Sequence, residues 1–313
     1  MNFTDKIKSE ILSKSIKEKH CKKAFVAGLI RGSGVLYERD GDLGVEFKVP
    51  DEQTAMTITT TFSQLYGYDI REVSTATEQG GKEKFYLNIS GKETVEILTD
   101  LGILTYNNGE IAVDLKFFGE FTKNECCVRA FIRGLFVASG RCTLPTENDN
   151  SSTGYHLEIN FSHYAPALET SEKLAQFGVL TKIVNRREGY IVYIKSAEEI
   201  KDFLAFLPAP ISVLKLTDLM INREFANTIN RQKNCDLANV TKQVEASAKQ
   251  VDAIKKIEQT IGIDRLKDDL AKTARFRLDY PDDTLNELAE RLAISKSCLN
   301  HRLRKIVMLA NEL

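Results

Sequence analysis

Two stretches of the chain share one pattern of apolar and small residues: "FVAGLIRGSG" at Phe25–Gly34 and "FIRGLFVASG" at Phe131–Gly140. A shift of 106 residues places Cys21–Gly34 on Cys127–Gly140, and seven of these fourteen positions are identical. A repeat of this length predicts two copies of one structural unit.

Each copy carries a stripe of small residues on one helix face. These residues recur at i, i+4 and i+8: Ala24, Gly28 and Gly32 in the first copy, and Ala130, Gly134 and Ala138 in the second. Because small side chains let two backbones approach closely, we predict that the two helices pack together through these stripes. We also expect Gly34 and Gly140 to end their helices in the left-handed conformation.

The segments after each repeat also correspond. Strands are predicted where apolar and polar residues alternate, and amphipathic runs predict helices. The predicted strands are Leu43–Val49, Lys84–Ile89, His156–Phe161 and Gly189–Lys195, and the predicted helices are Gln53–Tyr66, Glu93–Leu101, Ala167–Phe177 and Ala197–Phe206. Each unit therefore reads as helix, strands, helix, strands, helix, which makes a duplicated α+β domain.

The C-terminal region has an all-helical pattern with a sharp break. Thr284 and Glu287 have the spacing of a capping box that opens one helix. Ser295 is a good N-cap for a second helix. The buried faces are predicted to be Leu285, Leu288, Ala289 and Leu292 in the first helix, and Leu299, Leu303, Ile306 and Val307 in the second. Two short helices joined in this way predict a helix-turn-helix, with Ala293 at the turn position where glycine is usual.

Positive charge is concentrated on the second of these helices. The region from Asp252 onward holds 11 acids and 12 lysines and arginines, yet residues 296–305, "KSCLNHRLRK", contain no acid. The alternative is a solvated basic helix, but the preceding turn favours a recognition helix that enters the major groove of DNA. The expected base readers are Lys296, Ser297, Asn300 and His301, and the expected phosphate contacts are Arg302, Arg304 and Lys305.

Between the two regions lies a polar segment without proline or glycine, Met220–Ile254, which predicts helical segments joining two domains. Its core, "NRQKNCDLAN" at Asn230–Asn239, has asparagines and a cysteine that a spacer would not need. These residues suit either helix capping or contact with the DNA backbone, and the sequence leaves both possibilities open.

Composition narrows the class of protein. A length of 313 residues predicts two or three domains, and the net charge of −1 means that nucleic-acid binding must rest on local basic patches. The N-terminus lacks the pattern of a signal peptide, and the longest apolar run, Ala24–Ile30, is too short to cross a bilayer. We expect a cytoplasmic protein with no membrane partner.

Cysteine and histidine spacing gives no recognisable site. The six cysteines form no CxxC pair, and the four histidines form no HxxxH or HExxH pattern. We therefore expect reduced thiols, no metal site and no cofactor.

The paired motifs resemble the LAGLIDADG helices of homing endonucleases. In that family the eighth motif position of each helix carries an acid that holds a catalytic divalent metal. Here the eighth positions are Ser33 and Ser139, and the sixth are Arg31 and Val137. The resemblance implies the fold of that family, while the two serines predict that metal-dependent DNA cleavage is lost.

The face that binds DNA in such endonucleases is also altered. Strand alternation places Glu46 and Lys48 opposite the apolar side chains of the first unit, and Glu158 and Asn160 opposite those of the second. A glutamate at matched positions repels phosphate. The basic residues that remain nearby suit a solvated hairpin better than a DNA contact: Lys82, Lys84, Arg186 and Arg187.

The C-terminal helix pair resembles the promoter-reading helix-turn-helix of sigma factors. Together with the degenerate repeat, "NRQKNCDLAN" and "SKSCLNHRLRK" at Ser295–Lys305, it resembles the WhiA family over nearly the full chain. Cys298 stands where that family more usually has a small residue. The resemblance implies a transcription regulator with an inactive endonuclease-like domain and links to cell division, chromosome segregation and sporulation.

These observations predict three segments: a duplicated, inactive LAGLIDADG-like domain over 1–222 with repeat units at about 20–118 and 126–210, a helical linker over 223–250, and a helix-turn-helix domain over 251–313. The leading hypothesis is a sequence-specific regulator that binds double-stranded DNA at the nucleoid. Other transcription regulators or RNA polymerase are candidate partners. The alternatives are an architectural chromosome-associated protein and a metal-dependent homing endonuclease.

Overall fold

The structure is a computed structural model that describes the chain except for residues 1, 50, 71, 78–82, 146–153 and 187–188. For residues 72–74, 76, 77, 83 and 84 the structure describes the backbone but not the side chains. The chain forms two compact units, residues 1–223 and 224–313. No helix in the described part of the chain combines the length and the apolar content needed to cross a membrane.

The first unit contains the two predicted copies. The first copy comprises α2 (Lys19–Ser33), β1 (Gly34–Arg39), β2 (Asp42–Val49), α3 (Glu52–Tyr66), β3 (Glu72–Thr77), β4 (Glu83–Ser90) and α4 (Thr94–Asp100). The second comprises α5 (Glu125–Ser139), β7 (Gly140–Thr143), β8 (His156–Phe161), α6 (Tyr164–Gln176), β9 (Lys182–Arg186), β10 (Gly189–Ile194) and α7 (Ala197–Phe206). The predicted order of elements and the α+β fold are confirmed.

The outer and first strands of the sheets, β1, β3, β7 and β9, lie outside the predicted residue ranges. Four further elements of this unit also have no counterpart among the predictions: α1 (Phe3–Ser13), the hairpin of β5 (Leu104–Asn107) and β6 (Glu110–Val113), and the short helix η1 (Gly119–Thr122). The buried side chains of α1 include Ile7 and Ile11, so this helix contributes to the common core of the unit.

The two sheets have the same topology. All pairs are antiparallel, with strand orders β1-β2-β4-β3 and β7-β8-β10-β9. In β2 the predicted core face is confirmed, since Val45, Phe47 and Val49 are buried whereas Glu46 is exposed. In β8 Leu157 and Ile159 are buried and Asn160 is exposed.

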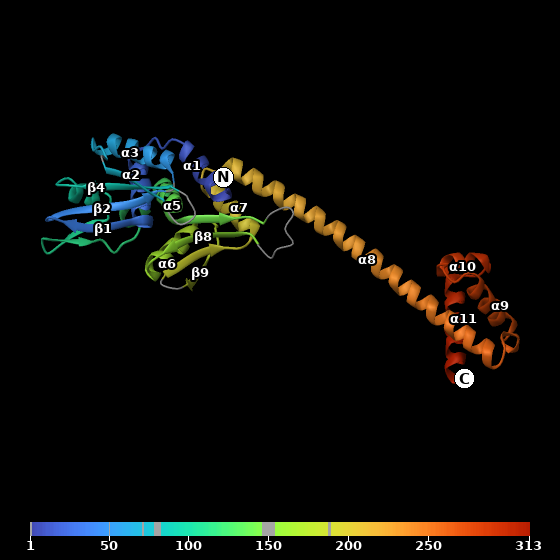
Figure 1. The fold of residues 1–313 in the computed structure, drawn as a ribbon. Helices are drawn as coiled ribbons and strands as arrows, with labels where there is room; N and C mark the ends of the chain where they lie inside the picture. Colours follow the sequence, from blue (N-terminus) through green and yellow to red (C-terminus); the bar gives the residue numbers. More distant parts are fainter. Residues whose placement is uncertain (1, 50, 71, 78–82, 146–153, 187–188) are drawn as a thin grey trace. The chain divides into compact units, whose positions relative to one another are not determined.

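The helices α2 and α5 pack directly against each other between the sheets (Figure 1). A Cβ atom built on Gly28 would lie 2.0 Å from the carbonyl oxygen of Phe131, and one on Gly134 would lie 2.0 Å from that of Phe25. A Cβ on Gly32 would lie 2.8 Å from the Cβ of Ala138. The two backbones are therefore in van der Waals contact, at a separation that only glycine permits.

The prediction for the glycines that end these helices is wrong. Gly34 and Gly140 have φ values of −76° and −80°, which are extended rather than left-handed, and the chain continues directly into β1 and β7. Glycine is needed at both positions because a Cβ atom would clash with the preceding helical turn. A Cβ on Gly34 would lie 2.6 Å from the oxygen of Ile30, and one on Gly140 would lie 2.2 Å from the ring of Phe136.

The helix α8 (Pro210–Thr260) begins in the first unit and continues into the second. The middle segment was predicted to be several helical segments, whereas α8 is one uninterrupted helix. In the second unit α8 is followed by η2 (Ile263–Arg265), α9 (Asp268–Asp279), α10 (Leu285–Arg291) and α11 (Lys296–Glu312). Ile254 and Ile257 of α8 join the apolar core that these helices share.

An arginine lies inside this small core. Arg277 of α9 is 2% exposed, and its Nη1 donates to the carbonyl oxygens of Tyr280, Pro281 and Asp283 at 3.3, 3.4 and 2.9 Å. Burial lowers the pKa of this guanidinium. These three hydrogen bonds to backbone oxygens tie Arg277 to the loop that leads into α10.

Candidate nucleic-acid interface

The helices α10 and α11 begin with the two predicted caps. The Thr284 hydroxyl accepts a hydrogen bond from the Glu287 amide at 3.2 Å, and the Glu287 carboxylate accepts one from the Thr284 amide at 2.7 Å. The Ser295 hydroxyl accepts from the Cys298 amide at 3.2 Å. These contacts satisfy amide groups that have no partner within the helix, and they fix where each helix starts.

The turn between the two helices has the backbone conformation that usually calls for glycine. Ala293 has a φ of +53°, and its amide donates to the oxygen of Glu290 at 3.0 Å. A left-handed alanine costs roughly 1–2 kcal/mol. The turn keeps this geometry because Leu288 and Ala289 of α10 and Leu299 of α11 are buried together on either side of it.

One face of α11 is buried and the opposite face is polar. Leu299, Leu303 and Ile306 are buried, and Val307 is half-buried. Five of the seven predicted DNA-binding residues are exposed together: Lys296, Ser297, His301, Arg304 and Lys305. Asn300 is half-buried at the edge of the apolar face. Across the described part of the chain, the side chains of Lys296, Arg304 and Lys305 form no intramolecular ion pair that would neutralise them.

Arg302 differs from its neighbours because it already has a partner. Its Nη1 donates to the carbonyl oxygen of Asp269 in α9, and its Nε lies 3.5 Å from the Asp269 carboxylate. The side chain is only 21% exposed. This contact ties α11 to α9, so Arg302 offers less charge to an external phosphate than Arg304 or Lys305.

In the first unit, Ser33 and Ser139 occupy the positions that carry acids in homing endonucleases, and both hydroxyl groups form hydrogen bonds to the backbone. Ser33 donates to the oxygens of Leu29 and Lys48 at 3.3 and 3.2 Å, and Ser139 donates to that of Leu135 at 3.2 Å. A neutral hydroxyl that donates to backbone oxygen is a poor ligand for a hard divalent cation, which prefers anionic oxygen.

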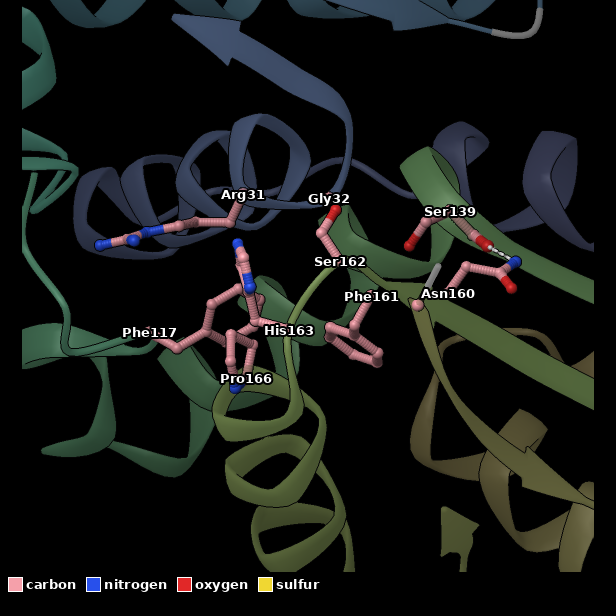
Figure 2. Close-up of a pocket in the computed structure, with 10 residues that line it drawn as sticks. Arg31, Gly32, Phe117, Ser139, Asn160, Phe161, Ser162, His163 and Pro166 are labelled. Carbon is pink, nitrogen blue, oxygen red and sulfur yellow. Dashed lines mark hydrogen bonds between the residues drawn. The ribbon is translucent and has the colours of Figure 1, made fainter. Parts of the chain in front are cut away.

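A cavity of about 700 Å³ opens beside this end of the helix pair (Figure 2). Its described lining includes Arg31, Ser139, Asn160 and His163 but no carboxylate. The Arg31 guanidinium donates to the carbonyl oxygens of Gly102 and Asp114 at 2.7 and 2.9 Å, and burial lowers its pKa. The described lining of this cavity therefore contains a cation and no anion.

The basic residues near the sheets are only partly described. Lys82 and Arg187 lie outside the described residues, as does the side chain of Lys84. Arg186, the last residue of β9, is exposed. Glu158 pairs with His156 at 2.9 Å.

One group of side chains is not predicted by the sequence patterns. His20 and Cys21 of α2 lie beside Cys126 and Cys127 of α5, and their four ligand-type atoms are all within 4.8 Å of one another. Burial raises the pKa of Cys21 to about 12 and also raises that of Cys127. The spacing of these residues along the chain matches no metal motif. The repeat register, however, aligns residues 20 and 21 with residues 126 and 127, and this alignment indicates that the two pairs lie close together.

Comparisons with known proteins cover nearly the whole chain. Family models match residues 19–104 as the WhiA N-terminal LAGLIDADG-like domain, 128–226 as the WhiA LAGLIDADG-like domain and 229–310 as the WhiA C-terminal HTH domain.

Among curated proteins, the chain is 32% identical over 320 residues to a Clostridium novyi protein, covering 100% of this chain and 98% of that protein. It is 34% identical over 317 residues to a Bacillus pumilus protein, covering 100% and 97%. Both relatives are named "Probable cell division protein WhiA". Among solved structures, full-length DUF199/WhiA from Thermatoga maritima matches with a TM-score of 0.59 at 21% identity, covering 100% and 99% of the two chains.

Proposed function

Because the chain belongs to the WhiA family, we propose that it is a sequence-specific DNA-binding transcriptional regulator linked to cell division, chromosome segregation and sporulation. The observation that carries this proposal is the exposed polar face of α11, which begins at a capped helix-turn-helix and holds cations without intramolecular partners among the described residues. The protein acts in the cytoplasm, at the nucleoid.

Each side chain of this face has a role that follows from its position. Lys296, Ser297 and His301 lie in the first turns of α11 and read base edges in the major groove, with Asn300 contributing from the margin. Arg304 and Lys305 lie one turn further and contact phosphates, which position the helix without reading sequence. Arg302 supports α11 through Asp269 and makes a smaller phosphate contribution.

The first unit has a supporting role in this proposal. Residues 1–222 form a LAGLIDADG-like domain without nuclease activity, residues 223–250 link it to the DNA reader, and residues 251–313 form that reader. The paired sheets serve as a surface for another transcription regulator or for RNA polymerase. Exposed Glu46 and the acid at Glu158 argue against a primary DNA-binding role for the sheets.

Footprinting of the full-length protein on genomic DNA fragments tests sequence specificity. We expect protection of a short, defined site, because base contacts from one recognition helix select a few successive base pairs. Smooth coverage that follows protein concentration rather than sequence would instead support the architectural alternative and reject a sequence-specific regulator.

We expect no cleavage of supercoiled plasmid by the full-length protein in Mg²⁺ or Mn²⁺. Ser33 and Ser139 donate to backbone oxygens, and neither supplies an anionic metal ligand. Gel analysis of nicked and linear products is the measurement. Cleavage that stays proportional to protein through successive purification steps, and that Ser33→Ala or Ser139→Ala removes, would contradict the assignment.

A further inference from the structure

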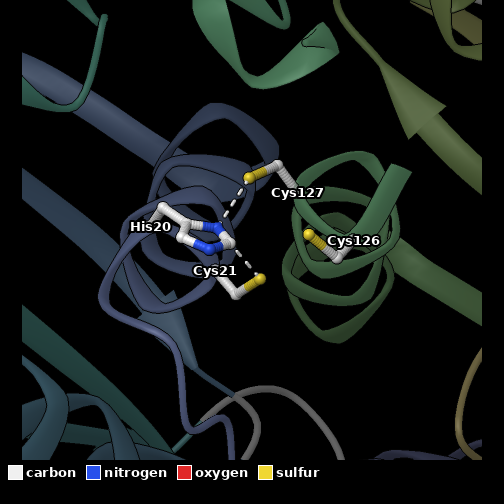
Figure 3. Close-up of side chains that lie close together, drawn as sticks. All are labelled: His20, Cys21, Cys126 and Cys127. Atoms are coloured by element: carbon white, nitrogen blue, oxygen red, sulfur yellow. Dashed lines mark hydrogen bonds between the residues drawn. The ribbon is translucent and has the colours of Figure 1, made fainter. Parts of the chain in front are cut away.

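Four side chains from the two copies of the repeat converge at the N-terminal ends of α2 and α5 (Figure 3). The His20 Nδ1 lies 3.1 Å from the Cys127 Sγ and 3.3 Å from the Cys21 Sγ. The Cys126 Sγ completes the group, in which all four ligand-type atoms lie within 4.8 Å of one another. No disulfide joins these cysteines.

The packing of the helix pair explains why these residues meet. Cys21 and Cys127 each precede the contacting glycine of their helix, Gly28 or Gly134, by seven residues. Seven residues are close to two helical turns, so each cysteine lies near the face of its helix that carries the glycine. Equivalent positions of the two copies therefore approach each other at this end of the pair.

The set of atoms has the chemistry of a structural zinc site. Three thiolates and one imidazole form a Cys₃His ligand set, with Zn–S bonds of about 2.3 Å and Zn–N bonds of about 2.0–2.1 Å. A tetrahedron with these bond lengths has edges of about 3.5–3.8 Å. The present separations, from 3.1 Å to less than 4.8 Å, bracket that value, so side-chain rotations suffice to enclose an ion.

Burial and charge also fit such a site. Cys21 and Cys127 are 7% and 4% exposed, whereas His20 and Cys126 are exposed and leave an ion a route from solvent. Zn²⁺ with three thiolates carries a net charge of −1, which the positive ends of two helix dipoles stabilise. Neither Glu18 nor Asn124, the N-cap residues, accepts a capping hydrogen bond from its helix. The site would thus place negative charge at two helix ends whose N-cap side chains accept no hydrogen bond from the helix.

We propose that His20, Cys21, Cys126 and Cys127 bind one zinc ion that clamps the N-terminal ends of α2 and α5 together. With four protein ligands the ion has no open position for substrate, so its role is structural. The clamp joins the two copies of the repeat at the end of the helix pair opposite Ser33 and Ser139.

Metal content tests this proposal directly. We expect the full chain, purified without an affinity tag under reducing conditions, to contain one zinc ion per chain. Inductively coupled plasma mass spectrometry measures this content. Cys126→Ser should weaken zinc binding by about 100-fold or more, given that loss of a mere supporting contact costs 10–100-fold. Cys235→Ser is the matched control, because Cys235 is also an exposed cysteine but lies in α8.

A second measurement starts from the wild-type protein, so that its result does not depend on a substitution. Wild-type protein stripped by a chelator should regain thermal stability when zinc is added, with Tm rising by about 5–10 °C at a zinc concentration 100 times Kd. Cobalt should give the visible absorption of a tetrahedral thiolate complex in wild type and in Cys235→Ser, but not in Cys126→Ser. Failure to bind zinc or cobalt, equal binding by Cys126→Ser, or a disulfide among these cysteines in the protein as isolated would overturn the proposal.

Discussion

The Gly28→Ala variant is expected to lose about 3 kcal/mol or more of unfolding free energy in the first unit. Alanine has the higher helix propensity by about 1 kcal/mol, so propensity alone predicts a gain in stability. The added Cβ, however, would lie 2.0 Å from the backbone oxygen of Phe131. The oxygen belongs to a helix backbone and cannot rotate away, so α2 and α5 must separate along their length. Urea unfolding followed by circular dichroism measures the change.

The sign of the effect distinguishes packing from propensity. Gly134→Ala should behave like Gly28→Ala, because its Cβ would lie 2.0 Å from the oxygen of Phe25. Gly154→Ala is the matched control, since a Cβ there meets no atom within 4 Å and the residue has no positive φ. We expect it to leave the unfolding midpoint nearly unchanged. Equal or higher stability of Gly28→Ala would show that the helix backbones are not in contact.

The double variant Arg304→Ala/Lys305→Ala is expected to bind every DNA sequence about tenfold more weakly or worse at moderate salt. It should also flatten the dependence of log K on log salt by about 1.8, because each phosphate contact contributes about 0.9 to that slope. Both cations are exposed and have no intramolecular ion pair among the described residues, so their removal leaves the core intact. Fluorescence anisotropy over a range of salt concentrations, on specific and unrelated duplexes, gives both quantities.

A matched pair of cations provides the control for this experiment. Lys255 and Lys256 are adjacent, exposed lysines on α8 in the same unit, and their replacement by alanine changes the net charge equally. We expect that variant to keep most of the wild-type affinity and slope. A comparable loss in both double variants would assign binding to overall charge rather than to α11.

Local patterns predicted much of the fold. The repeat register gave the order of the elements in both copies, and side-chain spacing gave the caps at Thr284 and Ser295, because these features depend on residues close together along the chain. A glycine at the end of a helix predicts the backbone conformation less well than these patterns do. Either a positive φ or a lack of space for a Cβ atom can require glycine, and at Gly34 and Gly140 the reason is the lack of space.

Local sequence patterns do not predict features that depend on contacts between residues far apart in the chain. The contact of Arg302 with Asp269 and the burial of Arg277 follow from how α9 packs against α11 and the loop before α10. The group of His20, Cys21, Cys126 and Cys127 joins pairs that are over a hundred residues apart. It forms only because Gly28 and Gly134 bring the helices into contact.

The most direct test of the account compares DNA binding by the full chain and by a chain that ends at Met220. The truncated chain retains both copies of the repeat and lacks α9, α10 and α11. Thermal unfolding establishes that it is folded, and anisotropy at fixed salt measures its affinity for the footprinted site. We predict that the full chain binds the site specifically and that the truncated chain does not. Equal affinity of the two chains would contradict the assignment of DNA recognition to α11.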